Sequence, residues 1–151
     1  MEHMPNDQAR WNAVFSFGFL VLFAFFFWGL TDGLDRFAWL YLLSAMDIVL
    51  LTLATFRIVR LVTFDKIFTF VRNWFLNKQG DGTYVKPPQG PRRTIAELME
   101  CLWCTGLWAA LLVSFLYFSS DIGRFFVIIL AVAALGSFFQ LISQMVGRIG
   151  H

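Results

Sequence analysis

Charge is scarce in this chain, and the shortage excludes several classes of protein. Charged residues make up 15% of the 151 residues, whereas hydrophobic residues make up 58% and the mean hydropathy is +0.66. A soluble domain is usually about a quarter charged. So much apolar surface cannot be hidden in one small core, so a lipid bilayer must cover the rest. The net charge of +2 is also too small for a nucleic-acid-binding protein.

Cysteine and histidine are scarce as well. The two cysteines cannot form a disulfide framework, and both lie in one C-x-x-C motif. The two histidines, His3 and His151, stand at the extreme ends of the chain. The sequence contains neither a Ser/His/Asp set nor a phosphate-binding glycine loop. We therefore expect a protein that is not an enzyme.

Long apolar stretches are present instead, and they predict four transmembrane helices. Residues 11–30 contain no ionisable side chain, and at about 1.5 Å per residue they match a hydrocarbon core of roughly 30 Å. This stretch lacks a cleavage site, so it reads as a retained span. Further spans are predicted at 37–56, from about Cys101 to Phe118 as the continuation of a helix over 95–118, and at 125–146. The predicted fold class is an all-α integral membrane protein, with two antiparallel helical hairpins and a cytoplasmic interfacial amphipathic helix.

The distribution of Lys and Arg predicts the orientation of these spans. Eight of the twelve lie between the second and third spans, whereas the two short turns hold one each, Arg36 and Arg124. The positive-inside rule then places the central segment in the cytoplasm. Four spans place both ends there too, residues 1–10 and 147–151.

The central segment begins with a basic amphipathic helix, predicted over 57–76. From Phe64 to Phe75 the apolar side chains fall on one side of a helix. Such a helix lies in the headgroup plane of a bilayer, but packing on the protein's own spans or on a neighbour is equally open. Its cations can bind anionic headgroups, form ion pairs or serve only as anchors of the topology. These cations are Arg57, Arg60, Lys66 and Arg72.

A linker and a capping motif follow this helix. Residues 77–93 are rich in glycine and proline and predict a flexible linker. Thr94 and Glu97 then match a capping box, which predicts one continuous helix over 95–118.

Cys101 and Cys104 lie inside that predicted helix, and three interpretations are open. With Glu97 and Glu100 they form one stripe, and two thiolates supply half of a tetrahedral zinc site. A redox motif normally has its first cysteine at a helix N-terminus, which an interior position does not provide. Alternatively, cysteine serves as a small apolar residue in helix packing. Other small residues predicted to pack helices are Gly106, Ala110, Ala133, Gly136 and Ser137.

Asp47 lies in the middle of the second predicted span. An ionisable group at that depth costs roughly 2.5–3.5 kcal/mol on insertion scales. We expect it to make a buried hydrogen bond between helices or subunits. The alternative is a proton or ion step.

Three motifs in the part of the chain from Asp47 onward resemble those of a bacterial family. They are R-x-x-R at Arg57 and Arg60, D-x-I at 65–67, and C-x-W-C-x-G-x-W at 101–108. Together they resemble short membrane proteins known only as a domain of unknown function, with sporulation-associated and phage-encoded members. The resemblance implies a bacterial or phage source, and hence the inner membrane, and adds no mechanism.

The sequence therefore predicts a structural or accessory inner-membrane protein that acts through helix–helix contacts. It would work as a homo-oligomer or as a small subunit of a larger membrane complex. Two alternatives are a pore, holin-like or transport subunit that uses Asp47, and a metal- or redox-responsive protein that uses Cys101 and Cys104.

Overall fold

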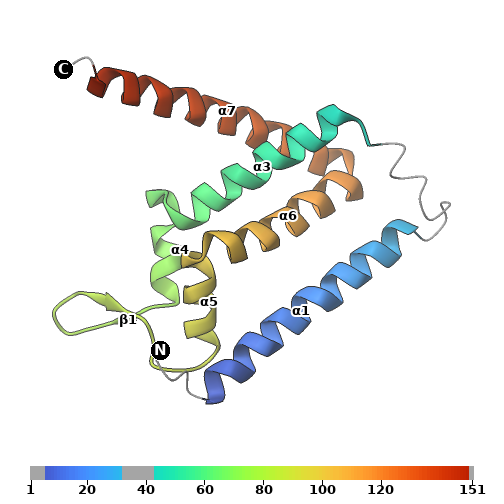
Figure 1. Ribbon diagram of the computed structural model, residues 1–151. Helices are drawn as coiled ribbons and strands as arrows, with labels where there is room; N and C mark the ends of the chain where they lie inside the picture. Colours follow the sequence, from blue (N-terminus) through green and yellow to red (C-terminus); the bar gives the residue numbers. More distant parts are fainter. Residues whose placement is uncertain (1–5, 32–42, 150–151) are drawn as a thin grey trace. The chain divides into compact units, whose positions relative to one another are not determined.

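Helices dominate the structure, a computed structural model that describes residues 6–31 and 43–149 (Figure 1). The longer helices are α1 (Asn6–Thr31), α3 (Ala45–Thr63), α5 (Pro91–Glu100), α6 (Leu102–Ser119) and α7 (Asp121–Ile149). Between α3 and α5 lie the 3-10 helix η1 (Lys66–Phe68), helix α4 (Thr69–Trp74), and the short strands β1 (Asn77–Lys78) and β2 (Tyr84–Val85). The predicted helical class is confirmed.

Three helices of the described residues are long and apolar enough to cross a membrane. They cover Gln8–Gly29, Leu102–Ser119 and Asp121–Arg148. The remaining predicted span, 37–56, lies partly outside the described residues. Its described part belongs to α3, which begins at Ala45 and continues beyond the predicted end to Thr63.

The chain divides into two compact units. The first comprises Met1–Asp32 and Val59–Trp108, and the second comprises Gly33–Ile58 and Ala109–His151. The first unit therefore holds α1, η1, α4, both strands and α5, and the second holds α7. Helices α3 and α6 contribute residues to both.

The first unit contains a β-hairpin where the sequence predicts a flexible linker over 77–93. β1 and β2 pair antiparallel, and in the turn the carboxylate of Asp81 accepts the hydroxyl and the N–H of Thr83 at 2.6 and 3.0 Å. The hydroxyl bond above all, and then the amide bond, lower the pKa of Asp81. Gly82 has the positive φ of 84° that this turn requires. The linker prediction is wrong here because these residues define a turn.

Arg92 connects the two ends of the hairpin segment. Its guanidinium donates to the carbonyl of Trp74 at 2.7 Å and to the carbonyl of Leu76 at 3.2 Å. These carbonyls belong to the end of α4 and the residues just after it, where helical partners run out. A side chain at the start of α5 thus satisfies the end of α4.

Helix α5 begins before the predicted capping box. Gly90 is the N-cap, with φ 98°, and Pro91 takes the first helical position, where its missing N–H is not needed. Thr94 therefore lies inside the helix, and its hydroxyl accepts a hydrogen bond from Gln8 of α1. The predicted cap at Thr94 is wrong because proline starts the helix about one turn sooner.

The amphipathic segment predicted over 57–76 is not one helix. α3 ends at Thr63, and Arg72 of α4 donates to the carbonyl of Val62 at 2.9 Å, which satisfies an acceptor in the last turn of α3. Four residues of the predicted apolar face are 57–76% exposed: Phe64, Ile67, Phe70 and Trp74. These four side chains are therefore not packed on the described part of the chain.

The second unit has a small core formed by α3, α6 and α7. Each of these helices gives one fully buried residue to the centre of this core, Ala54, Val113 and Val127 respectively. In the described helices, every buried hydrophobic side chain is alanine or valine: Ala54, Ala96, Ala109, Val113, Val127, Ala131 and Ala134. Small side chains let helix backbones approach closely, which is how helices associate in lipid.

A close backbone approach occurs at the start of α7. A Cβ on Gly123 would lie 2.7 Å from the carbonyl carbon of Leu116. Ser120 is the single residue between α6 and α7, and its hydroxyl accepts the N–H of Gly123 at 3.1 Å. Ser120 therefore caps α7, and Gly123 lets the first turn of α7 lie against the last turns of α6.

The small residues predicted to pack helices are not the packing positions within the chain. Around Gly106 and Gly136 an added Cβ would meet nothing within 4 Å, and Ala110 is exposed. Ala133 and Ser137 are only half-buried, and the Ser137 hydroxyl donates back to its own helix. The buried positions are neighbours of these residues: Ala109, Ala131 and Ala134. The prediction is wrong for contacts within the chain and stays a prediction for contacts between chains.

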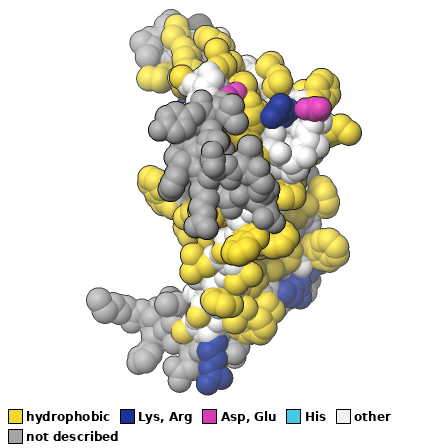
Figure 2. Space-filling view, turned by 90° about the vertical axis from the view of Figure 1, so that its right-hand side faces the viewer, with side chains coloured by type: hydrophobic (Ala, Val, Ile, Leu, Met, Phe, Trp, Pro, Cys, Tyr) yellow, Lys and Arg dark blue, Asp and Glu magenta, His cyan; other side chains and the backbone are white. Residues whose placement is uncertain are grey.

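Large apolar side chains face outward. Figure 2 shows hydrophobic side chains over much of the face in view, with few charged ones among them. On α1, Phe17 and Phe25 are 67% and 74% exposed, and on α7 Phe139 and Met145 are both 66% exposed. Water is a poor surrounding for such a surface.

Candidate functional site

The long predicted helix breaks at the C-x-x-C motif. α5 ends at Glu100, Cys101 adopts an extended conformation (φ −83°, ψ 103°), and α6 begins at Leu102. The prediction of one continuous helix over 95–118 is therefore wrong at this point. Cys101 joins two helices and directly precedes the N-terminus of the second.

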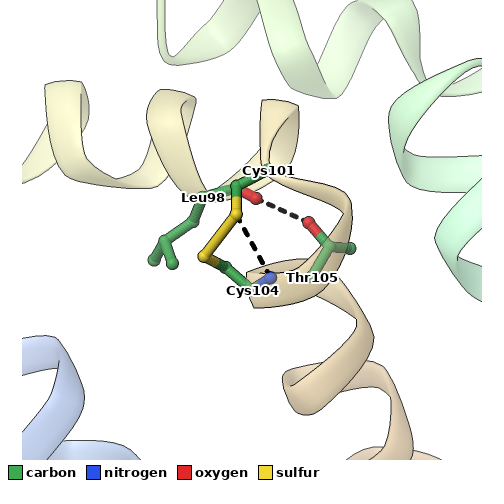
Figure 3. Close-up of a disulfide and its surroundings, with 4 residues drawn as sticks. All are labelled: Leu98, Cys101, Cys104 and Thr105. Carbon is green, nitrogen blue, oxygen red and sulfur yellow. Dashed lines mark hydrogen bonds between the residues drawn. A yellow bond between two sulfur atoms is a disulfide. The ribbon is translucent and has the colours of Figure 1, made fainter.

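Thr105 replaces a hydrogen bond that the break removes. In a continuous helix the carbonyl of Leu98 would accept the amide of Leu102. In the structure the buried hydroxyl of Thr105 donates to the Leu98 carbonyl at 2.6 Å (Figure 3), and the Thr105 amide donates to the carbonyl of Cys101 at 2.9 Å. The Leu98 carbonyl also accepts the amide of Cys101 at 3.2 Å, so Thr105 adds a second donor to it. This bond ties the first turn of α6 to the last turn of α5 and stabilises the break.

Cys101 and Cys104 are joined by a disulfide at this break (Figure 3). Their Cα atoms are 5.3 Å apart, a usual separation for a disulfide. The amide of Cys104 donates to the sulfur of Cys101 at 3.3 Å, in the manner of an N-cap interaction. The break removes the objection to redox chemistry, because Cys101 stands at a helix N-terminus and not inside a helix.

The disulfide lines a cleft within the first unit. The cleft has a volume of about 540 Å³, and its walls include Asn12 and Phe19 of α1, Glu97 of α5 and Trp108 of α6. The rings of Phe19 and Trp108 meet edge to face, with centroids 5.1 Å apart. A mostly apolar cleft of this size, with a few polar groups, is typical of a binding site.

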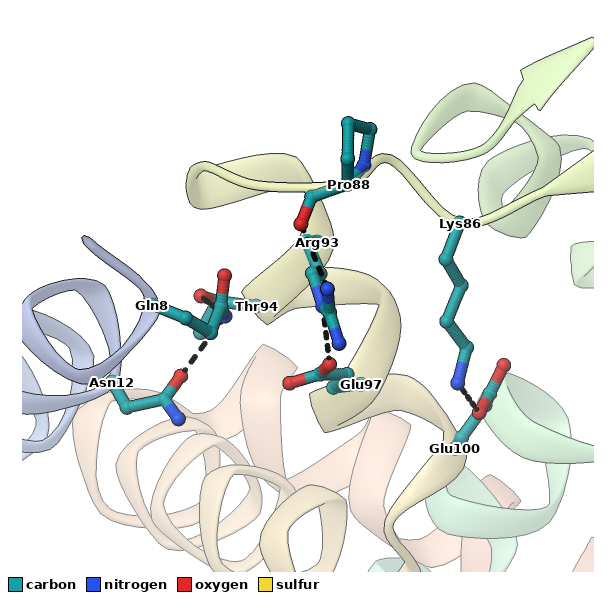
Figure 4. A network of polar contacts seen from close by, with 8 residues as sticks. All are labelled: Gln8, Asn12, Lys86, Pro88, Arg93, Thr94, Glu97 and Glu100. Carbon is teal, nitrogen blue, oxygen red and sulfur yellow. Dashed lines mark hydrogen bonds and ion pairs between the residues drawn. The ribbon is translucent and has the colours of Figure 1, made fainter. Parts of the chain in front are cut away.

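A polar network holds α1 against α5 beside the cleft (Figure 4). The fully buried side chain of Gln8 donates to the hydroxyl of Thr94 at 2.6 Å and to the side-chain oxygen of Asn12 at 3.3 Å. The Oε1 atom of Gln8 is also buried and has no hydrogen-bond partner among the described residues. A buried hydrogen bond is worth about 1 kcal/mol net, so Thr94 fixes where α1 meets α5.

Both glutamates of the predicted zinc site are engaged by cations. Arg93 donates to Glu97 at 2.8 Å, and Lys86 pairs with Glu100 at 2.5 Å (Figure 4). Cysteines in a disulfide are not thiolate ligands. Within the described ranges no group of three His, Cys, Asp or Glu residues is placed to hold a metal ion. The zinc site is therefore not assembled in this structure, and the two terminal histidines lie outside the described residues.

Asp47 stands in the first turn of α3. α3 begins at Ala45, and the Asp47 carboxylate accepts the N–H of Ser44 at 2.9 Å, as in a capping box. It also accepts the hydroxyl of Tyr117 of α6 at 2.5 Å. The guanidinium of Arg124 lies over the Tyr117 ring, 5.4 Å from its centroid. Asp47 is therefore not in the middle of a helix over 37–56, and its depth in a bilayer stays a prediction. The hydrogen bond to Tyr117 joins two helices, as predicted, but it is only partly buried.

The four cations predicted to meet headgroups have different surroundings. Arg72 is used to cap α3, and the guanidinium of Arg60 lies 5.7 Å from the ring centroid of Phe64. Arg57 is half-buried on α3, whereas Lys66 is exposed on η1. Headgroup binding stays a prediction for these residues.

Several structural residues were not found from the sequence: Gln8, Arg92, Thr105, Tyr117 and Gly123. A polar side chain in or beside an apolar span needs a partner, since lipid offers none. That signal could have found Gln8, Thr105 and Tyr117. Arg92 and Gly123 gave no signal, because their roles depend on which segments meet.

The described residues form a mostly helical protein, and three of its helices are long and apolar enough to cross a membrane. A family model described as "Protein of unknown function (DUF1360)" matches residues 50–143. The chain belongs to this family, and the resemblance drawn from its motifs is confirmed.

Two curated relatives come from Bacillus subtilis (strain 168). "Sporulation protein YjcA" is 42% identical over 76 residues, which are 45% of this chain and 64% of the relative. "UPF0713 protein YngL" is 33% identical over 95 residues, which are 60% of this chain and 73% of the relative. The chain thus spans slightly less than two thirds of the first relative. No solved structure matches the chain.

Proposed function

We propose that this chain is a structural or accessory protein of a bacterial inner membrane and that it acts through contacts between helices. The observation that carries this proposal is the inverted distribution of its apolar side chains. The buried ones are alanine and valine, whereas phenylalanines and methionines face outward. A protein that folds in water usually also buries isoleucine, leucine, phenylalanine and methionine completely. Lipid and partner helices are the surroundings that suit the outward-facing ones.

The segment after α3 supports a seat on the membrane surface. Its exposed stripe, Phe64, Ile67, Phe70 and Trp74, follows directly from the basic end of α3. Aromatic side chains prefer the headgroup region, and nearby cations favour anionic lipids. In this proposal the stripe rests on the cytoplasmic leaflet and both chain ends lie in the cytoplasm.

The contacts of Asp47 favour a structural role over an ion pathway. Its two carboxylate oxygens are engaged by the N–H of Ser44 and the hydroxyl of Tyr117. A carboxylate that fixes a helix end to its neighbour has little freedom to load and release an ion. A role in helix contacts therefore accounts for both contacts of Asp47, whereas a role in a pore accounts for neither.

Native mass spectrometry tests the proposal on the full chain, extracted gently from its own membrane. A mass at a multiple of 17.4 kDa supports a homo-oligomer, and additional protein masses support a subunit of a larger complex. A monomer without partners, found both in detergent and in nanodiscs, would overturn the proposal.

Reporter insertion tests the orientation separately. A reporter that is active only in the cytoplasm, placed after Gly82, should be active. The same reporter placed after Ser120 should be inactive. The opposite pattern would invert the proposed topology and leave the oligomeric state untouched.

A further inference from the structure

We infer that Cys101 and Cys104 form a redox-active disulfide at the junction of α5 and α6, which a protein or small-molecule dithiol opens and a disulfide oxidant closes. This inference goes beyond helix contacts, because it assigns a chemical reaction to the first unit. Three observations support the inference: the position of Cys101, the hydrogen bond that the amide of Cys104 donates, and the cleft that both cysteines line.

The position of Cys101 stabilises the charged form that exchange requires. Cys101 directly precedes the first turn of α6, and its sulfur accepts the N–H of Cys104 at 3.3 Å. Amides at a helix N-terminus stabilise negative charge. Once the disulfide opens, Cys101 is therefore the better leaving group and carries the thiolate.

The cleft gives a reductant access to the sulfurs. Both cysteines are only half-buried and line the opening of about 540 Å³ between α1, α5 and the start of α6. Its apolar walls, with Phe19 and Trp108, suit a small dithiol or the cysteine-bearing loop of a partner protein. A buried structural disulfide would lack such access.

The exchange can be written as two balanced displacements. One thiolate of the dithiol attacks the sulfur of Cys104, the bond between the two cysteines breaks, and Cys101 leaves as a thiolate. The second sulfur of the dithiol, as a thiolate, attacks the mixed disulfide and releases Cys104. Two electrons pass to the cysteine pair and the dithiol becomes a disulfide. Of the two protons that the dithiol loses, one goes to Cys104 and the other to solvent, because Cys101 stays a thiolate. Oxidation is the reverse.

The proposed orientation places this disulfide on the cytoplasmic side of the membrane. Disulfides are rare on the cytoplasmic side, where those that form are usually transient, catalytic or redox-sensing. Placing Cys101 at the cytoplasmic end of α6 rests on the proposed function, whereas the reactivity of the pair does not.

Opening the disulfide also changes what holds the helix break. In the oxidised protein Cys101 is tied covalently to the first turn of α6, and Thr105 bonds the carbonyl of Leu98. In the reduced protein the covalent link is lost, and the Thr105 contacts and the bonds of the Cys101 amide to Glu97 and Leu98 hold the break. We therefore expect the amides of residues 101–105 to exchange with solvent at different rates in the two states.

Redox titration tests the reactivity on the full chain in phosphatidylcholine–phosphatidylglycerol nanodiscs. The protein is equilibrated with mixtures of reduced and oxidised dithiothreitol, quenched with acid, and labelled with a maleimide that adds mass. We expect one reversible two-electron transition, reached from both directions, with unchanged helical circular dichroism. A pair that stays oxidised until the helices unfold, or one that diamide cannot oxidise, would overturn the inference.

Single-cysteine variants test which sulfur carries the charge. In Cys104→Ser the remaining Cys101 should react with iodoacetamide roughly fivefold faster at neutral pH than Cys104 does in Cys101→Ser, as expected for an N-cap contact. Equal rates would contradict the assigned roles. Hydrogen exchange over 98–105, compared between reduced and oxidised protein, should differ, and Thr105→Val should enlarge that difference while Thr105→Ser should not. Identical exchange in both redox states would refute the effect on the junction.

Failure of these tests and failure of the proposed function are distinguishable. The titration depends on neither oligomeric state nor orientation, so a redox-inert pair in an oligomeric protein would remove only this inference. A monomer with a reversible pair would remove only the proposed function.

Discussion

Gly123 is the position at which one added methyl group should disturb the helices most. Alanine in place of glycine normally stabilises a helix by about 0.5–1 kcal/mol. At Gly123 the new Cβ would lie 2.7 Å from the carbonyl carbon of Leu116, a backbone atom that cannot rotate away. Overpacking of this kind costs about 1–3 kcal/mol. Steric overlap should therefore exceed the helix gain, and Gly123→Ala should destabilise the protein by roughly 1–2 kcal/mol.

The same substitution elsewhere in α7 provides a matched control. An alanine Cβ at Gly136 would meet nothing within 4 Å, so Gly136→Ala should be neutral or should stabilise by up to about 1 kcal/mol. Both variants can be compared with the parent protein in mixed micelles. The free energy of unfolding is obtained from helical circular dichroism as the fraction of sodium dodecyl sulfate rises.

The sign of the difference decides the outcome. Equal free energies of unfolding for the two variants would refute the reasoning, because they would mean that the added Cβ at Gly123 causes no steric overlap with Leu116. A gain at Gly123 would show that the backbones do not approach there.

Three further changes test other contacts. Tyr117→Phe removes the hydroxyl that Asp47 accepts at 2.5 Å and should lower the free energy of unfolding in the same assay. An equal loss when Asp47 is already alanine would contradict the pairing. Gln8→Leu removes the donor to α5 and should speed amide hydrogen exchange in α1, whereas unchanged exchange would contradict this contact. The pKa of Asp81 is lower in the folded protein than its unfolded value of 3.8. Its bonds to Thr83 therefore stabilise the hairpin fully above pH 3.8, and this stabilisation is lost as the pH falls through the folded pKa. Nuclear magnetic resonance shifts of the hairpin should therefore titrate in acid, and the same titration in Asp81→Asn would contradict the assignment.

The sequence predicted the helices but not their ends. The apolar run over 11–30 predicts most of α1. The helix begins earlier, at Asn6, because the polar residues before the run are also helical. The start of α5 was readable, since Gly90 and Pro91 are an N-cap and an N1 residue. Ser44 is likewise a typical N-cap residue just before α3. It lies within a long apolar stretch, however, and this stretch predicts one uninterrupted span.

The candidate site depended on contacts that no local pattern contains. Nothing at Cys101 is a helix breaker, and the break is held by Thr105 and by the disulfide. The packing face of α6 was misplaced because Ala109 and Ala110 are equally small. About 100° of helix rotation separates neighbouring residues, so only the facing helix decides which one is buried.

The hairpin held by Arg92 offers a practical entry point to the molecule. The guanidinium of Arg92 bonds the carbonyls of Trp74 and Leu76. The residues before and after the hairpin are therefore held together at its base. Loop-closure entropy rises by only about 0.6 kcal/mol for each doubling of loop length. An epitope or affinity tag inserted beside Gly82 should therefore be carried without moving α4 or α5. The terminal segments would stay unmodified, and the native protein could be captured from its membrane through its own surface loop.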